Sequence, residues 1–118
     1  MGEYRLTLLK LTVRDRCFFD EALASEEGNR AASGLDAKIH AFVQIGAMIA
    51  TDAAPQSYAI CVDAARQAGA SVDEIVGTLV AAMPVLGTPT VVAAAGKLGV
   101  ALGYDIDLAL ERNAELDD

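Results

Sequence analysis

The sequence has few of the residues from which metal and redox sites are usually built. Its 118 residues include one histidine, two cysteines and no tryptophan. A multi-histidine metal site is therefore excluded, and any Ser/His/Asp triad would depend on His40. Cys17 and Cys61 show neither a CxxC motif nor a Cys/His metal spacing. We expect no metal and no bound cofactor.

Basic residues are also few. Nine Lys and Arg stand against 17 Asp and Glu, which gives a net charge of −8. Phosphate binding needs clustered basic side chains, so the sequence predicts no nucleic-acid partner and no membrane partner. The amino-terminal residues lack the long apolar core and small-residue cleavage site of a secretory signal. We therefore expect a cytoplasmic protein.

One stretch of the chain carries no charge. Residues 75–96 are uncharged over 22 positions, a length that is sufficient to span a bilayer. Pro84, Gly87 and Pro89 divide this stretch, and proline and glycine interrupt helices. The division predicts two buried helices joined by a turn rather than a membrane span.

Apolar residues are abundant for so short a chain. They make up 53% of the sequence, and 23 of them are alanine, a residue that favours helices and is depleted in strands. This composition predicts an all-α fold in a single domain, residues 1–118. A domain of this length buries only roughly two thirds of its surface. The apolar surplus therefore predicts a homo-oligomer, in which another subunit covers part of it.

The amino-terminal third is expected to be only partly helical. Two apolar patches separated by the charged residues 14–16 predict two short helical segments within residues 4–23. The polar, glycine-bearing residues 25–34 predict a loop. Residues 1–34 thus form an N-terminal helical extension, and residues 35–118 form the helical core.

The core begins with two helices joined at a proline. Asp36 caps the first, which ends near Thr51 or Asp52, and Pro55 precedes the second, over residues 56–68. This second helix stops at a glycine, Gly69. The spacing of the apolar residues predicts that the two helices bury Ile39, Phe42, Val43, Ile49, Tyr58, Ile60, Ala64 and Ala65.

Three more helices are expected from their end signals. They run from the capping box of Ser71 and Glu74 through Met83, over residues 90–102 to Gly103, and from Asp105 to about Glu115. In the middle helix of the three, Gly96 and Gly99 have the spacing that allows close contact between helix backbones.

Two side chains are candidates for chemistry. His40 lies one helical turn before Gln44, which predicts either a polar pair beside a pocket or a partly exposed helix histidine. Cys61 has Ser57 one turn before it and is either a buried apolar side chain or a reactive thiol. Cys17, beside two phenylalanines, is expected to be packed.

Residues 35–107 resemble the carboxymuconolactone decarboxylase family, which includes the alkyl hydroperoxidase D-like proteins. The resemblance is carried by the segment LDAKIHAFVQIGAMIA, by A-x-x-A-G-A-S-x-D-E-I at residues 65–75, and by the Ala-rich segment AAAGKLGVALGYD. It implies a small all-helical domain with an antiparallel helix pair, assembled as trimers or hexamers. No such motif occurs in residues 1–34.

The redox members of that family carry C-x-x-C-x-x-x-H before the AGAS-like turn and a glutamate on the preceding helix. Counting back from that turn, the places of the two cysteines hold Ala54 and Ser57 here, and the place of the histidine holds Cys61. The place of the glutamate falls at Ala41 or Phe42. Because a serine hydroxyl forms no disulfide, the resemblance implies that the dithiol redox site is lost.

Three functions are open at this point. The first is acid–base chemistry on, or binding of, a small lactone or carboxylated metabolite, in an apolar pocket lined by Gln44, Ser57 and Tyr58, with His40 or Cys61 moving the proton. Such an enzyme would be a decarboxylase or lyase rather than a peroxidase. The second is a one-cysteine enzyme, in which Cys61 reduces a hydroperoxide and an outside thiol recycles it. The third is a non-catalytic oligomer that binds a small apolar ligand or a protein.

Overall fold

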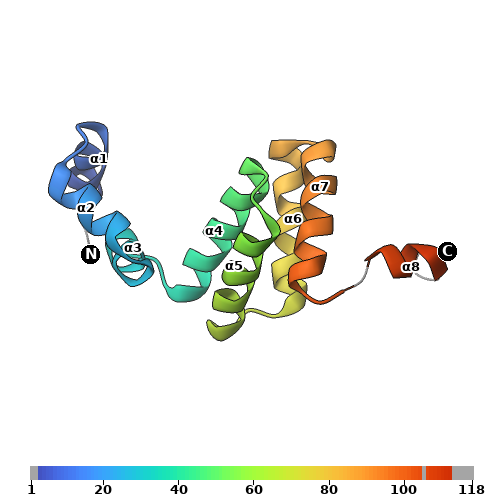
Figure 1. The fold of residues 1–118 in the computed structure, drawn as a ribbon. Coiled ribbons are helices and arrows are strands. Elements are labelled where there is room, and N and C mark those ends of the chain that lie inside the picture. Colours follow the sequence, from blue (N-terminus) through green and yellow to red (C-terminus); the bar gives the residue numbers. More distant parts are fainter. Residues whose placement is uncertain (1–2, 105, 113–118) are drawn as a thin grey trace. The chain divides into compact units, whose positions relative to one another are not determined.

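The structure, a computed structural model, describes residues 3–104 and 106–112, and every regular element in this part of the chain is an α-helix. The all-α prediction is confirmed for these residues. The helices, in chain order (Figure 1), are α1 (Tyr4–Thr12), α2 (Arg16–Ala24), α3 (Glu26–Ser33), α4 (Ala37–Thr51), α5 (Pro55–Gln67), α6 (Val72–Leu86), α7 (Thr88–Ala101) and α8 (Ile106–Arg112).

The chain forms two compact units, Met1–His40 and Ala41–Asp118. The first unit holds α1, α2, α3 and the first turn of α4. The second holds the remainder of α4 together with α5, α6, α7 and α8.

The first unit is built from short capped helices. α1 and α2 lie where the sequence predicts two helical segments, and the Asp15 carboxylate caps α2 by accepting a hydrogen bond from the amide of Phe18 (3.0 Å). α2 packs against α3. Cys17 is exposed, so the prediction that it is packed is wrong. Consecutive helix residues point about 100° apart, and the half-buried Phe18 and Phe19 occupy the packed side of α2.

The prediction of a loop over residues 25–34 is also wrong, because α3 occupies most of this segment. The Ser25 hydroxyl caps the helix by accepting from the third amide of its first turn (2.9 Å). Glu26 and Glu27 stand at the positive end of the helix dipole. Gly34, with a φ of 72°, ends the helix in the left-handed conformation. These end signals favour a helix in a segment that has few apolar residues.

In the second unit, α7 packs against both α5 and α6 (Figure 1). The core combines one face of each of these helices with one face of α4, and alanines at several contacts let the helix backbones approach. The buried core residues are Ala41, Ile45, Ile49, Tyr58, Cys61, Val62, Ala65, Ala70, Ile75, Leu79, Val91, Ala94 and Leu98.

Four of the predicted end signals of the core helices are confirmed. The Asp36 carboxylate accepts from the amide three residues on (2.8 Å) and caps α4. At α6, the Ser71 hydroxyl accepts from the amide of Glu74 (3.0 Å), whose carboxylate accepts from the amide of Ser71 (2.9 Å). Gly69 and Gly103 follow α5 and α7 with φ values of 96° and 80°.

The uncharged stretch divides at Gly87 rather than at Pro84. α6 continues past Met83 and through Pro84, which lies in its last turn, and the chain leaves the helix at Gly87 with a φ of 88°. A proline this close to the carboxyl end removes one helix hydrogen bond and leaves the earlier turns intact. Among the described residues, no helix has the length and apolar character needed to cross a membrane.

The faces that α4 and α5 bury differ in part from the prediction. Phe42, Ile49, Tyr58 and Ala65 contribute to the core as predicted, but Ile39, Val43, Ile60 and Ala64 are exposed. α4 carries apolar residues on all sides, so their spacing did not show which side meets the other helices. The exposed residues belong to the apolar surplus of the chain.

Two further predictions concern the last two helices. A Cβ atom placed on Gly96 would meet no atom within 4 Å, so the expected close contact at this glycine does not occur within the chain. Gly99 is buried. α8 lies within the predicted last helix, whose predicted ends, Asp105 and Glu115, lie outside the described residues.

Candidate functional site

His40 lies in the first turn of α4, which the Asp36 carboxylate caps, and the backbone carbonyl of Asp36 accepts a hydrogen bond from the amide of His40 (2.9 Å). Its residue exposure is only 8%, so the side chain is buried. The imidazole Nε2 is 2.7 Å from Oδ1 of Asn29, which lies on α3. His40 is therefore a buried histidine held by a hydrogen bond, not the partly exposed histidine of the alternative interpretation.

Asn29 was not a candidate in the sequence, yet it makes two hydrogen bonds. Besides its contact with His40, its Nδ2 donates to the backbone carbonyl of Ala22 (2.8 Å), near the end of α2. The side chain thus links α2, α3 and the start of α4. Asparagine is common in loops, and only the presence of a helix at α3 shows that this side chain points at its neighbours.

In the second unit, Gln44 and Cys61 lie together. Gln44 is half-buried on α4, and the thiol of Cys61, on α5, donates to its Oε1 at 3.9 Å. Cys61 is 7% exposed. On α5 the half-buried Ser57 precedes Cys61 by four residues, the spacing at which side chains share a helix face. Gln44 follows His40 on α4 at the same spacing.

Tyr58 is the most deeply buried of the predicted site residues, with an exposure of 0%. Its hydroxyl has no hydrogen-bond partner, and no other buried side-chain polar atom in the described part of the chain is in this situation. Burial raises the pKa of the Tyr58 phenol above its ordinary value of 10.0, and the Asp52 carboxylate raises it further. Tyr58 is therefore a neutral hydrogen-bond donor without an acceptor.

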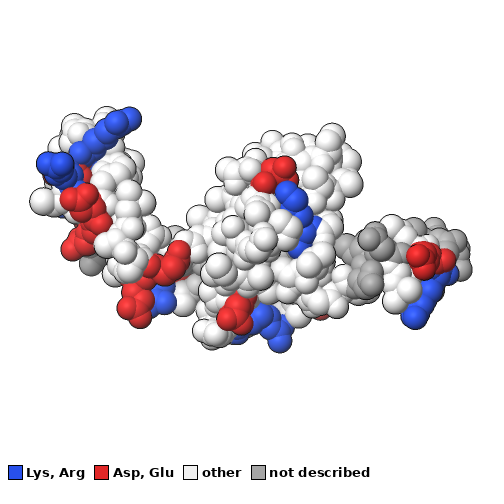
Figure 2. All heavy atoms as spheres, in the orientation of Figure 1, with Lys and Arg blue, Asp and Glu red and all other residues white. Residues whose placement is uncertain are grey.

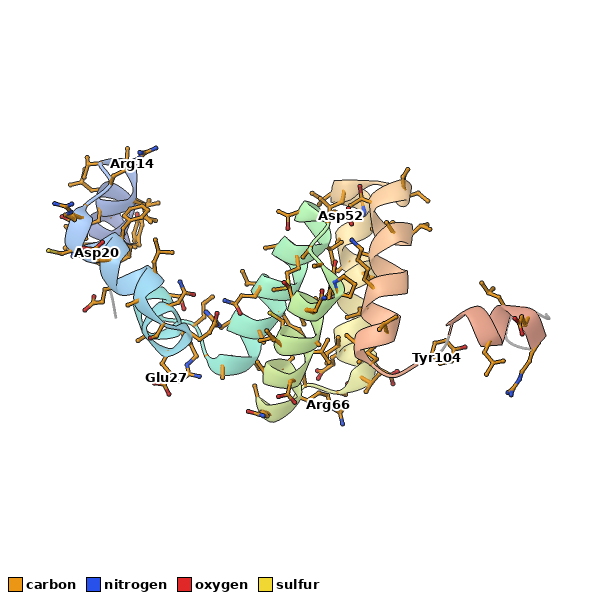
Figure 3. The ribbon with its side chains drawn as sticks, in the orientation of Figure 1. Arg14, Asp20, Glu27, Asp52, Arg66 and Tyr104 are labelled. Atoms are coloured by element: carbon orange, nitrogen blue, oxygen red, sulfur yellow. The ribbon has the colours of Figure 1, made fainter. Side chains whose placement is uncertain are left out.

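Lys97 was also missed in the sequence. Its ammonium group lies 2.5 Å from the Asp52 carboxylate and 3.1 Å from the carbonyl oxygen of Ala53. Asp52, at the end of α4 (Figure 3), has a φ of 53°, and Lys97 comes from α7, 45 residues away. The available signal was that Lys97 is the only charged residue within residues 75–103.

Three grooves lie elsewhere on the two units. In the second unit, an apolar groove of about 430 Å³ follows α6 and α7, and a groove of about 450 Å³ that Asp63 and Arg66 help to line follows α5. The first unit has a groove of about 290 Å³ that Asn29 and Ala22 help to line. The five predicted residues His40, Gln44, Ser57, Tyr58 and Cys61 line none of these three grooves. In the part of the chain with described coordinates, no three His, Cys, Asp or Glu side chains are grouped to hold a metal ion.

Comparison with known proteins decides the family. The model of the carboxymuconolactone decarboxylase family matches residues 19–98, more than half of the chain. The chain belongs to the carboxymuconolactone decarboxylase family. A search of curated proteins and a search of solved structures each gave no match. The family match begins before Leu35, in α2, so it includes part of the segment in which the sequence showed no family motif.

Within this carboxymuconolactone decarboxylase-family chain, the matched residues contain every predicted site residue, from His40 to Cys61. They also contain the two residues that the sequence did not indicate, Asn29 and Lys97. The family match therefore covers the hydrogen-bonded groups described above, in both units.

Proposed function

We propose that this family member transfers a proton on a small lactone or carboxylated metabolite, or binds one, without thiol redox chemistry. The observation that supports proton transfer is the burial of His40 together with its hydrogen bond to Asn29. An imidazole can give and take a proton near neutral pH, and a fixed orientation makes that transfer efficient. Gln44, Ser57 and Tyr58 are proposed to bind the ligand, and Cys61 is the other candidate for moving the proton.

The substrate class follows from the family name and from general chemistry. Loss of CO2 from a carboxylated lactone breaks one C–C bond, and its electron pair moves into the conjugated carbonyl. The carboxylic acid has to give up its proton before CO2 leaves, and a proton then has to reach carbon. One imidazole that alternates between its two protonation states supplies both transfers.

The absence of a dithiol supports the loss of redox chemistry. The family places for the two cysteines hold Ala54 and Ser57 here, and Ser57 is half-buried at the start of α5. The two cysteines of the chain lie in different units. Cys17, in the first unit, is exposed, and Cys61, in the second, is buried.

The one-cysteine hydroperoxidase is the alternative enzyme. Reactive cysteines lie in electropositive, partly exposed surroundings, whereas Cys61 is buried and donates to the oxygen of Gln44. Iodoacetamide labelling with mass spectrometry tests this alternative, because Cys17 provides an exposed reference in the same molecule. We expect Cys17 to be modified first. Faster modification of Cys61, together with its oxidation by a hydroperoxide, would support the alternative.

A non-catalytic ligand-binding protein is the second candidate. The observation that favours it is the Tyr58 hydroxyl, a buried donor with no acceptor. A carbonyl or carboxylate oxygen of a ligand could accept that hydrogen bond and remove the cost of leaving it unmade. Binding without turnover, lost in Tyr58→Phe and retained in His40→Ala, would favour this candidate over the enzyme.

We also propose that the chain forms a homo-oligomer, a trimer or hexamer as the family resemblance implies. Large apolar side chains remain exposed on the second unit, and much of its visible surface in Figure 2 is uncharged. On α7 the exposed Val92 and Val100 flank Gly96, which leaves room for another chain. Light scattering at micromolar concentration tests the proposal, and a monomeric mass would refute it.

The main test is an activity assay in which the purified chain is mixed with carboxymuconolactone or one of a panel of related lactones. The assay measures the release of CO2 and the change in absorbance of the lactone. We expect turnover by the wild type, its loss in His40→Ala, and full activity in the control Gln67→Ala, which changes the exposed end of α5. Turnover that is unchanged in His40→Ala but lost in Cys61→Ala would assign the proton to the thiol. If the double variant His40→Ala, Cys61→Ala retained both turnover and ligand binding, the proposed site would be refuted.

A further inference from the structure

The side-chain amide of Asn29 can make both of its hydrogen bonds in only one orientation. Its Nδ2 donates to the carbonyl of Ala22 (2.8 Å), and its Oδ1 lies 2.7 Å from Nε2 of His40. Rotating the amide by 180° would bring Oδ1 against the Ala22 carbonyl oxygen, so that two acceptors would face each other. The hydrogen bond to Ala22 therefore determines which atom of Asn29 meets His40.

The tautomer of His40 follows from that orientation. An amide oxygen can only accept a hydrogen bond, so Nε2 of His40 has to carry the proton and donate it. In the neutral imidazole the other nitrogen, Nδ1, then holds the lone pair. We propose that Asn29 is the positioning residue that fixes His40 in the Nε2–H form, so that Nδ1 is the nitrogen that takes up and returns the proton.

This inference rests on the proposed function, because it assigns one atom to the proton transfer proposed for His40. When Nδ1 accepts a proton from the ligand, the ring becomes an imidazolium, and the Nε2–H bond to Asn29 becomes charge-assisted. When Nδ1 returns the proton, the ring is neutral again and Asn29 is unchanged. No oxidant or further reactant takes part.

An amide suits this position better than a carboxylate. Aspartate at position 29 would favour the charged imidazolium and hold the proton on Nδ1, whereas the neutral amide orients both forms of the ring. Asparagine also brings a donor that aspartate lacks. That donor satisfies the Ala22 carbonyl, one of the last four carbonyls of α2, which have no partner within their own helix.

The backbone around Asn29 accounts for its placement. The amide of Asn29 donates to the carbonyl of Ser25 (2.9 Å) in the first turn of α3, and α3 packs on α2. On the other side, Asp36 holds the amide of His40 in the first turn of α4. Both partners of the hydrogen bond are therefore placed by capped helix starts, and they lie eleven positions apart in the chain.

The test is the nitrogen spectrum of the imidazole, which is unambiguous because the sequence contains one histidine. The full chain, labelled with 15N-histidine and without a histidine tag, is measured at about pH 8, where an ordinary imidazole is neutral. We expect a protonated Nε2, an unprotonated Nδ1, and a visible Nε2–H proton that exchanges slowly with water. A wild-type spectrum with the proton on Nδ1 would overturn the proposal without any variant.

Two variants and a control separate positioning from folding. Asn29→Ala should give a mixture of tautomers and lose the slow Nε2–H signal. Asn29→Asp should keep the proton on Nε2, because it keeps the acceptor, and should also increase the share of rings that carry a second proton on Nδ1. Ser33→Ala, which removes a hydroxyl bonded to the backbone of the same helix, should leave the spectrum unchanged. An unchanged single tautomer in a folded Asn29→Ala would also overturn the proposal.

The failure of this inference is distinguishable from that of the proposed function. If His40→Ala retains full turnover, the proposed proton transfer fails, even if the spectrum shows the Nε2–H tautomer. If the spectrum shows Nδ1–H, the positioning role of Asn29 fails, whatever the activity.

Discussion

Replacing Tyr58 with phenylalanine should stabilise the protein. The hydroxyl is fully buried and has no partner, and burying an unsatisfied polar group costs about 1–3 kcal/mol. Tyr58→Phe removes that cost, and the small space left by one oxygen offsets part of the gain. We expect a net increase of about 1 kcal/mol in the free energy of unfolding, which raises Tm by about 4 °C in a domain of this size.

The pH dependence of this effect has a definite sign. The pKa of Tyr58 is raised in the folded protein, so its neutral form is favoured there. The corresponding stabilisation is complete below the unfolded pKa of about 10 and is lost as the pH rises from that value toward the folded pKa. The advantage of Tyr58→Phe over the wild type should therefore grow as the pH increases above about 10.

Urea unfolding followed by circular dichroism measures both effects. Wild type and variant are compared at equal protein concentration, because assembly would add to the apparent stability. Tyr104→Phe is the matched control, since Tyr104 is exposed, and it should change the free energy by less than about 0.5 kcal/mol. A loss of stability in Tyr58→Phe would refute the reasoning, because it would show that the hydroxyl has a hydrogen-bond partner in solution.

Three further predictions concern the scaffold. Ile45→Ala should destabilise the protein by about 2–5 kcal/mol, because Ile45 is fully buried, whereas thermal unfolding of the exposed-site control Ile60→Ala should change little. Ser71→Ala should cost about 1 kcal/mol by removing half of the capping box, and an unchanged urea midpoint would contradict it. Lys97→Met should lower the free energy of unfolding by up to about 1 kcal/mol, and by less at high salt. Proteolysis at the turn after α4 should become faster in this variant. Equal rates of proteolysis would show that the ion pair with Asp52 adds no stability.

Features set by interactions within a few residues could be predicted from the sequence. The Asp36 cap, the capping box of Ser71 and Glu74, and the left-handed Gly69 each involve atoms at most four residues apart. The same local chemistry also makes α3, where Ser25 and Gly34 supply the ends. The loop prediction there relied on the polar, glycine-bearing composition and gave too little weight to these capping residues.

Features that depend on which helix faces which could not be predicted in the same way. Ile60 and Tyr58 are both apolar-bodied side chains on α5, yet Ile60 is 70% exposed and Tyr58 is buried. A helix with apolar residues on several sides has no single preferred face until its neighbours are placed. The hydrogen bonds of Lys97 to residues 44 and 45 positions earlier depend on the same packing.

By itself, the sequence determined the helical class, most helix ends and the family resemblance, because composition, capping and motif spacing are local properties of the chain. The tertiary structure decided that His40 is buried, that Asn29 is its partner, and that Cys61 meets Gln44. A hydrogen bond forms over about 3 Å, and only folding brings side chains from different helices to that distance.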